Sequence, residues 1–222
     1  MNMAVIKNHD FVEIEYTGII KENNAVFDTT SKSIAKENGL NDENADYFPM
    51  IICIGENQAL KGLEEQIVGK ETGKEYRFEI SFEKAFGRRY PNLIQLITAN
   101  KFRQQKIQPI PGLRINVDGL FGVIKTVSGG RCLVDFNHPL AGRDLIYNVK
   151  INKIVDDVKE KVDSLIKSSF HIKDAQIEIK EDSATISLKG KVPNKAQEEF
   201  KKLVNRTIPE IKNLSIIAEE DK

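Results

Sequence analysis

The stretch NQALKGLEEQIVGKETGKEY, residues 57–76, combines a helical pattern with three glycines. Its apolar positions fall at helical spacing and predict a short helix with one buried face; they are Ala59, Leu60, Leu63 and Ile67. Glycine inside a helix costs about 1 kcal/mol relative to alanine, so Gly62 favours a helix that packs closely on a neighbouring element. Gly69 and Gly73 predict the end of this helix and the turn that follows it.

Predicted strands lie on both sides of this helix in the sequence. Residues 11–20, FVEIEYTGII, alternate apolar and polar side chains, which is the pattern of a half-buried strand in an antiparallel sheet. Further strands are predicted at AVFDTT (25–30), PMIICIG (49–55), KEYRFEISF (74–82) and RDLIYNVKINKIV (143–155). Residues 31–47 form a polar loop in which a short helix fits. The predicted fold class is α+β, with an antiparallel sheet and few helices.

The chain is long enough for more than one domain. Its 222 residues exceed the usual size of a single domain, so two or three units are expected. Between residues 88 and 136, short apolar runs alternate with glycine turns, which indicates a small β-rich domain inserted into the first one. Residues 155–222 follow the order helix, strand, strand, helix, strand, typical of a small α+β domain. The predicted domains are 1–87 with 137–154, 88–136, and 155–222.

Composition and charge exclude several classes of function. The 33 basic residues balance the 33 acidic ones, so the chain has no overall attraction for nucleic acid or acidic lipid. Cys53 and Cys132 are far apart and form no C-x-x-C motif, and His9, His138 and His171 form no local cluster. We therefore expect no metal site and no cofactor. The sequence shows neither a signal segment nor a long apolar run, which predicts a cytoplasmic protein with no membrane partner.

An unusual apolar and aromatic set surrounds one acid, Asp28. Asp28 follows Phe27 at the end of a strand and must face solvent or find hydrogen-bond partners, because a lone buried carboxylate is unfavourable. The other members are Tyr16, Met50, Ile54, Ala59, Leu60, Leu63, Phe86 and Tyr147. Two interpretations remain open here: the set is the ordinary core of a sheet packed on a helix, or it lines a pocket. The chain has no phosphate-binding glycine loop and no G-x-S-x-G motif, so covalent catalysis is not indicated.

Five motifs together suggest a family. They are YTG at 16–18, FDTT at 27–30, IGENQALKGLEEQIVGKETGKEY at 54–76, AFG at 85–87 and NHPLAGRDLIYNV at 137–149. In order and spacing, these motifs resemble the FKBP-type peptidyl-prolyl cis-trans isomerases, and more narrowly the SlyD-type and archaeal long forms. The resemblance covers roughly residues 5–154. It implies an antiparallel FKBP-like sheet wrapped on a short helix and interrupted by an insert-in-flap domain.

The resemblance also implies the residues of a prolyl pocket. They are Tyr16, Phe27, Asp28, Met50, Ala59, Leu60, Leu63, Phe86, Leu140 and Tyr147. The backbone N–H of Leu60 would donate to a carbonyl of the bound peptide. Leu63 stands where many members have tryptophan, although an aliphatic residue is usual among SlyD-like members. Phe86 stands where many members have tyrosine, and the missing hydroxyl is expected to weaken substrate binding.

By the same resemblance, the chain isomerises X-Pro bonds in unfolded or nascent polypeptides that contain proline, and its insert binds these clients as a chaperone. The insert residues expected to bind clients are Leu93, Ile94, Leu96, Ile97, Phe102, Ile107 and Ile110, with a small core as the alternative role. A binding-only chaperone, with Phe86 and Leu63 as signs of lost activity, is the second hypothesis. Residues 155–222 carry no family motif; we expect them to serve homodimer formation or client holding. Their lysines are balanced by glutamates, so no nucleic-acid partner is expected.

Overall fold

The computed structural model describes residues 4–40, 42, 47–117 and 119–219. The chain divides into two compact units, Met1–Ile80 with Leu145–Lys222, and Ser81–Asp144. Each unit has a hydrophobic core of its own. Residues 155–222 fall in the first unit, so their predicted role as a separate domain stays a prediction.

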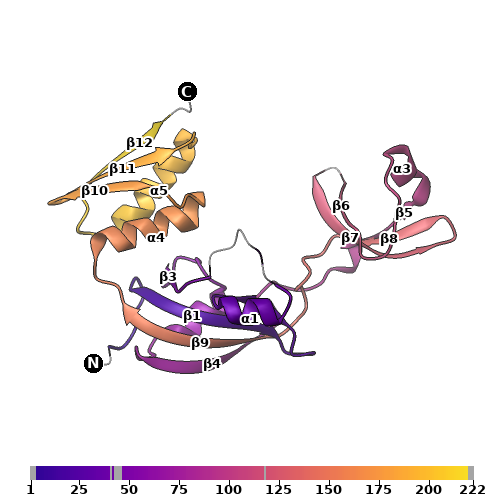
Figure 1. Ribbon diagram of the computed structural model, residues 1–222, viewed down its shortest axis with the longest axis horizontal. Coiled ribbons are helices and arrows are strands. Elements are labelled where there is room, and N and C mark those ends of the chain that lie inside the picture. Colours follow the sequence, from indigo (N-terminus) through magenta and orange to yellow (C-terminus); the bar gives the residue numbers. More distant parts are fainter. Residues whose placement is uncertain (1–3, 41, 43–46, 118, 220–222) are drawn as a thin grey trace. The chain divides into compact units, whose positions relative to one another are not determined.

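The first unit is built on a five-stranded antiparallel sheet. Its strand order is β2-β1-β9-β4, and β3 also pairs with β1 (Figure 1). The strands are β1 (Phe11–Ile20), β2 (Val26–Thr29), β3 (Met50–Cys53), β4 (Lys74–Ile80) and β9 (Leu145–Ile154). Alternating apolar residues bury one face of β9 and leave the intervening residues exposed or half-buried along much of its length. The α+β class with antiparallel sheets, predicted from this alternation, is confirmed.

Two short helices accompany this sheet, α1 (Lys32–Glu37) and α2 (Lys61–Ile67). The helix predicted from the apolar spacing starts too early, at position 59. Ala59 and Leu60 precede α2, and Leu60 is its N-cap. Gly69 and Gly73 adopt positive φ angles of 78° and 75°, which glycine permits without a steric penalty. They end α2 and form the turn into β4 as predicted.

The second unit is a small β-rich body with its own core. Its elements are the 3₁₀ helices η1 (Phe82–Lys84) and η2 (Pro91–Leu93), strands β5 (Ile94–Thr98), β6 (Arg114–Val117), β7 (Leu120–Ser128) and β8 (Arg131–Asp135), and helix α3 (Ala99–Gln104). The strands form an antiparallel sheet in the order β5-β8-β7-β6. Phe102 on α3 packs in the core with Ile115, Ile124 and Val134.

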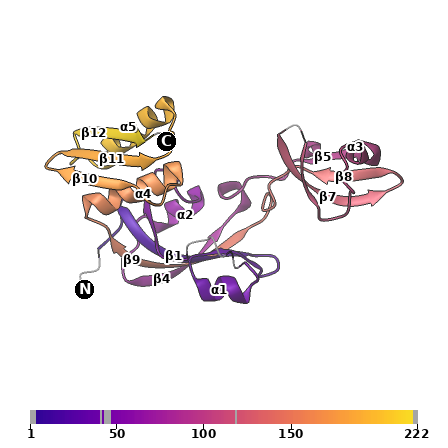
Figure 2. The same ribbon diagram turned by 45° about the horizontal axis from the view of Figure 1, so that its top comes forward.

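The C-terminal part of the first unit contains α4 (Val158–Phe170), β10 (Gln176–Lys180), β11 (Ser183–Lys189), α5 (Asn194–Thr207) and β12 (Asn213–Glu219). Strand β10 pairs antiparallel and β12 parallel with the central β11. Asp157 directly precedes α4 as its N-cap, and its carboxylate accepts a hydrogen bond from the Glu160 N–H. Helix α4 lies beside β3 of the first sheet (Figure 1), and Figure 2 shows α4 with β10, β11 and β12 from a second direction.

No helix among residues 4–40, 42, 47–117 and 119–219 has the length and apolar character needed to cross a membrane.

Candidate active site

Three aromatic side chains come together on neighbouring strands of the first sheet. Tyr16 lies on β1, Phe27 on β2 and Tyr147 on β9. The ring centroids of Tyr16 and Tyr147 are 5.6 Å apart, and those of Phe27 and Tyr147 are 5.8 Å apart with an edge-to-face angle of 80°. Such geometry is favourable for aromatic pairs and adds to the stabilisation from burial. These three residues, predicted from the family resemblance, therefore form one aromatic wall.

Asp28 is exposed and accepts a hydrogen bond of 2.7 Å from the hydroxyl of Tyr16. Asp28 at the strand end therefore faces solvent and also has a hydrogen-bond partner. Burial raises the pKa of Tyr16, and the Asp28 carboxylate raises it further by disfavouring a second negative charge. Burial raises the pKa of Tyr147 as well. Both phenols therefore stay protonated near neutral pH. The Tyr16 hydroxyl, bound to Asp28, is a fixed polar group at the edge of the aromatic wall.

The loop before α2 is held by Glu64, a residue that sequence reasoning missed. Its carboxylate is 5% exposed and accepts backbone N–H groups from Gly55 (2.8 Å), Asn57 (3.3 Å) and Ala59 (2.8 Å). Within the described ranges the next N–H, that of Leu60, has no acceptor. Glu64 is therefore a positioning residue that fixes the loop and leaves one backbone donor available.

The predicted pocket residues of the first unit divide into three groups. Tyr16, Asp28 and Met50 line a cavity of about 750 Å³. Phe27 and Tyr147 support the Tyr16 side of this cavity through their ring contacts. The remaining three, Ala59, Leu60 and Leu63, do not line the cavity, and the Leu63 side chain is only 2% exposed.

Phe86 and Leu140 belong to the second unit. The Phe86 ring stacks on the imidazole of His138, with centroids 4.3 Å apart and planes 7° from parallel. The Leu140 N–H donates to Nδ1 of the same imidazole at 3.2 Å. The AFG and NHPLAG motifs therefore meet through His138, and the predicted pocket roles of Phe86 and Leu140 stay predictions.

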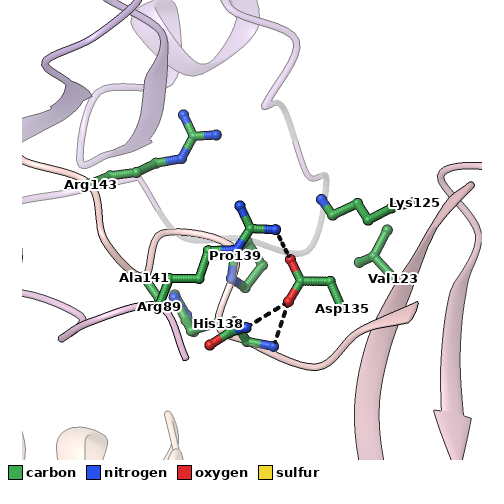
Figure 3. A pocket seen from close by; sticks show the side chains of 9 residues that line it. Arg89, Val123, Lys125, Asp135, His138, Pro139, Ala141 and Arg143 are labelled. Atoms are coloured by element: carbon green, nitrogen blue, oxygen red, sulfur yellow. Dashed lines mark hydrogen bonds and ion pairs between the residues drawn. The ribbon is translucent and has the colours of Figure 1, made fainter. Parts of the chain in front are cut away.

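The two chain segments at the base of the second unit are joined by side chains (Figure 3). Asn137 accepts from the Tyr90 N–H at 2.8 Å and donates to the Tyr90 carbonyl at 3.0 Å, as a paired strand residue would. Asp135 accepts from the Asn137 side chain at 2.8 Å and from Arg89 at 2.5 Å. Figure 3 shows both contacts converging on the Asp135 carboxylate. The three side chains Arg89, Asp135 and Asn137 line a cavity of about 90 Å³, and no sequence motif points to this network.

Acid is expected to weaken this network through Asp135. Burial alone would raise the Asp135 pKa, but hydrogen bonds from Asn137 and the charge of Arg89 lower it below its ordinary 3.8. The ionised carboxylate therefore stabilises the fold above pH 3.8, and this contribution is lost as pH falls through the folded-state pKa. The Asp135→Asn variant should unfold more easily at pH 6 by about 1 to 2 kcal/mol, a difference that shrinks at pH 3.

Urea unfolding followed by amide exchange in the second unit measures this difference at each pH. The matched control is Asp174→Asn, an exposed aspartate of the first unit, which should leave the same amides unchanged. Equal destabilisation by Asp135→Asn at pH 6 and pH 3 would show that packing, rather than charge, explains its effect.

The predicted client-binding residues of the insert have different exposures. Leu96 and Ile110 are exposed, at 65% and 53%. Phe102 is 3% exposed and packs in the core, which is the alternative role expected for these residues, and its client-binding role stays a prediction. The others are half-buried: Leu93, Ile94, Ile97 and Ile107. Sequence reasoning missed two exposed apolar residues at the start of β7, Leu120 (56%) and Phe121 (76%), because two consecutive apolar residues do not show which one faces the core until the partner strands are known.

Comparisons with known proteins agree with these observations. A family model described as "FKBP26, IF domain" matches residues 95–140. The chain is 32% identical over 150 residues to the short-type peptidyl-prolyl cis-trans isomerase of Methanocaldococcus jannaschii, an alignment that covers 68% of this chain and 94% of the relative.

Bacterial relatives show the same family. Identity is 30% over 110 residues to the FKBP-type 16 kDa peptidyl-prolyl cis-trans isomerase of Escherichia coli, covering 48% of this chain and 74% of the relative. It is 26% over 152 residues to the FKBP-type isomerase SlyD of Helicobacter pylori, covering 66% of this chain and 76% of the relative. The aromatic wall, the antiparallel sheet and these relatives lead to one conclusion: the chain belongs to the FKBP-type peptidyl-prolyl cis-trans isomerases and is a SlyD-like member of that family.

Proposed function

We propose that this chain catalyses cis-trans isomerisation of X-Pro bonds in unfolded or partly folded proteins, and that its inserted residues bind those proteins as a chaperone. The main support for isomerase activity is the aromatic wall of Tyr16, Phe27 and Tyr147. Tyr16 of this wall also lines a cavity of about 750 Å³. A cavity of this size is within the range that holds a small ligand or a short peptide. The names of the related proteins support the same activity.

The chemistry requires no covalent step. Resonance in the amide creates a rotation barrier of about 18 to 20 kcal/mol, and uncatalysed exchange at proline takes tens to hundreds of seconds. The twisted amide is less polar than either planar isomer. An apolar wall that excludes water therefore favours the twisted state over the planar states, and this difference in binding is the catalysis.

Two polar groups position the peptide beside the aromatic wall. The Leu60 N–H donates to a carbonyl of the bound chain, in a loop that Glu64 holds in place. The Tyr16 hydroxyl, bound to Asp28 at 2.7 Å, forms the polar edge. Neither group transfers a proton, so the rate should depend little on pH between about 6 and 8.

A protease-coupled or fluorescence assay of a short X-Pro peptide tests the isomerase. We expect acceleration that saturates with substrate and falls when Tyr147 is replaced by alanine. No acceleration above background, together with intact suppression of aggregation, would favour the second hypothesis, a binding-only chaperone.

The insert is expected to matter for protein substrates more than for short peptides. A client held by the insert of the same chain presents its prolines to the active site at a raised effective concentration, an effect that reaches about 10² to 10⁴ in linked systems. Deletion of residues 88–136, with the ends joined, should therefore lower catalysed refolding of a proline-limited protein by at least about tenfold more than short-peptide turnover.

Point variants in the full chain test the same expectation if the deletion variant misfolds. Leu96→Asp combined with Ile110→Asp places charges at two exposed apolar positions of the insert and should reduce client refolding in the same direction. Ile217→Asp is the matched control, at an apolar position of the first unit that is 51% exposed. Equal loss of peptide turnover and protein refolding in the insert variants would exclude the insert as the client site.

A further inference from the structure

The cavity beside Tyr16 has a second wall, which comes from the C-terminal part of the chain. Tyr16 and Asp28 line one side of its volume of about 750 Å³. The opposite side is formed by α4 and the residues directly after it, with Lys167, Ser168 and His171 among the lining residues. All of these residues belong to the first unit. The proposed proline site and α4 therefore enclose the same space.

Apolar packing fixes α4 against the first sheet. Phe11 on β1 and Cys53 on β3 share one buried core with Val162 and Leu165 of α4. Each of these four side chains is at most 1% exposed. Removing these apolar side chains from water stabilises the contact between α4 and the sheet, so the fold itself holds this wall in place.

Gln58 ties the same wall to the loop of the proposed site. Its carbonyl oxygen accepts the Cys53 N–H at 2.6 Å, and its amide nitrogen donates to the Ser168 hydroxyl at 3.0 Å. Gln58 stands two residues before Leu60, the proposed backbone donor. The position of α4 and the position of that donor are thus linked by one side chain.

The wall offers hydrogen-bonding groups to a bound peptide. The Lys167 ammonium lies 2.6 Å from the Asp163 carboxylate, and both residues line the cavity together with Lys173. Because Lys167 and Asp163 neutralise each other, this pair does not select a charged side chain. The ammonium, hydroxyl and imidazole groups of the wall suit the main-chain carbonyls and N–H groups of an extended peptide.

We infer that α4 is part of the substrate-binding site and contacts the extended main chain of an unfolded protein beside the proline that is isomerised. The inference rests on the proposed function. Its occupant is the flanking segment of the substrate, because the cavity is continuous from Tyr16 to His171 and has room for more than one residue. The C-terminal residues then determine how well long substrates bind, in addition to any role in assembly.

Obstruction of this wall in the full chain tests the inference. Lys167→Trp places a large ring at an exposed position of α4 that lines the cavity. Lys159→Trp is the control, because it places the same ring at an exposed position of α4 outside the cavity lining. For a proline peptide of about twelve residues, Lys167→Trp should raise KM about fivefold, equivalent to about 1 kcal/mol. For a tetrapeptide, kcat/KM should stay within about twofold, and Lys159→Trp should change neither substrate.

The outcomes separate this inference from the proposed function. Equal effects of Lys167→Trp on both peptides, or no effect on either, would overturn the inference while leaving the isomerase intact. If the unaltered chain turns over neither peptide, the proposed function fails. The wall is then judged by binding alone, from the Kd of a fluorescent twelve-residue peptide, and an unchanged Kd in Lys167→Trp would overturn it.

Discussion

The Gly18→Ala variant is expected to lower kcat/KM for a short proline peptide by about tenfold, which equals about 1.4 kcal/mol of lost transition-state binding. A Cβ atom at position 18 would lie 2.6 Å from Cζ of Phe27 and 3.0 Å and 3.1 Å from its two Cε atoms. Real Cβ atoms do not approach so closely, so the Phe27 ring must move. Phe27 packs edge-on against Tyr147, and a displaced ring opens the aromatic wall.

The backbone of Gly18 is not the reason for this expectation. Gly18 is buried within β1, opposite Asp28 on β2 and Tyr147 on β9, and its φ is not among the positive angles. The strand backbone at position 18 therefore accommodates a methyl group, and the steric clash is with the Phe27 ring. Overpacking of this kind costs about 1 to 3 kcal/mol, so the variant should remain folded.

Gly122→Ala is the matched control for packing strain. Its Cβ would lie 2.7 Å from Phe136 and 2.9 Å from Val134 in the core of the insert. It should destabilise the fold by a similar amount but leave tetrapeptide turnover unchanged. A second test is Gly18→Ala with Phe27→Leu, which should regain stability without regaining activity because the ring is absent. Full activity in Gly18→Ala would show that the Phe27 ring is not part of the catalytic wall.

The parts of this fold that sequence predicts well are those with a local pattern. Alternation in FVEIEYTGII and RDLIYNVKINKIV is enough to place two long strands, because the side-chain period of a strand is fixed. Gly69 and Gly73 mark the end of α2 because positive φ restricts the residue type. The aromatic wall was predicted from motifs of the family.

The parts that sequence did not predict depend on partners that are distant in the chain. Asn137 resembles any polar loop residue until Tyr90 is placed opposite it. Phe102 has the same character as the exposed Leu96, and only the fold of α3 onto the sheet separates core from surface. The wall formed by α4 requires the packing of residues 162–166 on strands that precede them by more than a hundred positions. Such tertiary contacts have no local pattern.

Glu64 belongs to this second class, and its removal is expected to have the largest effect on the site. The Glu64→Ala variant should lower kcat/KM for a short proline peptide by about 100-fold, the size of effect that follows from a misplacement of about 1 Å. The carboxylate accepts three backbone N–H groups of the loop that ends at Leu60. Asn57 in this loop has a φ of 55°, a conformation that non-glycine residues rarely adopt without support.

Stability should fall with activity in this variant. Gly55 and Asn57 are exposed, so water can replace the carboxylate at two of the three N–H groups, and Ala59 is half-buried. The free energy of unfolding should therefore fall by about 1 to 3 kcal/mol, the cost of one N–H left without an acceptor. If Glu64→Ala fails to fold, Glu64→Gln keeps the prediction measurable, because the amide retains one acceptor oxygen and should give intermediate losses of both quantities.

The decisive comparison is between Glu64 and its neighbour on α2. Glu65 is exposed, so Glu65→Ala should change tetrapeptide turnover by less than about twofold and serves as the control for helix propensity. In Glu64→Gln, most of the loss should appear in kcat/KM for every proline peptide regardless of length, since we propose that the Leu60 donor contacts the peptide at the proline itself. If Glu64→Gln keeps normal turnover although its stability falls, the Glu64 hydrogen bonds serve folding alone, and the Leu60 N–H does not bind the substrate carbonyl.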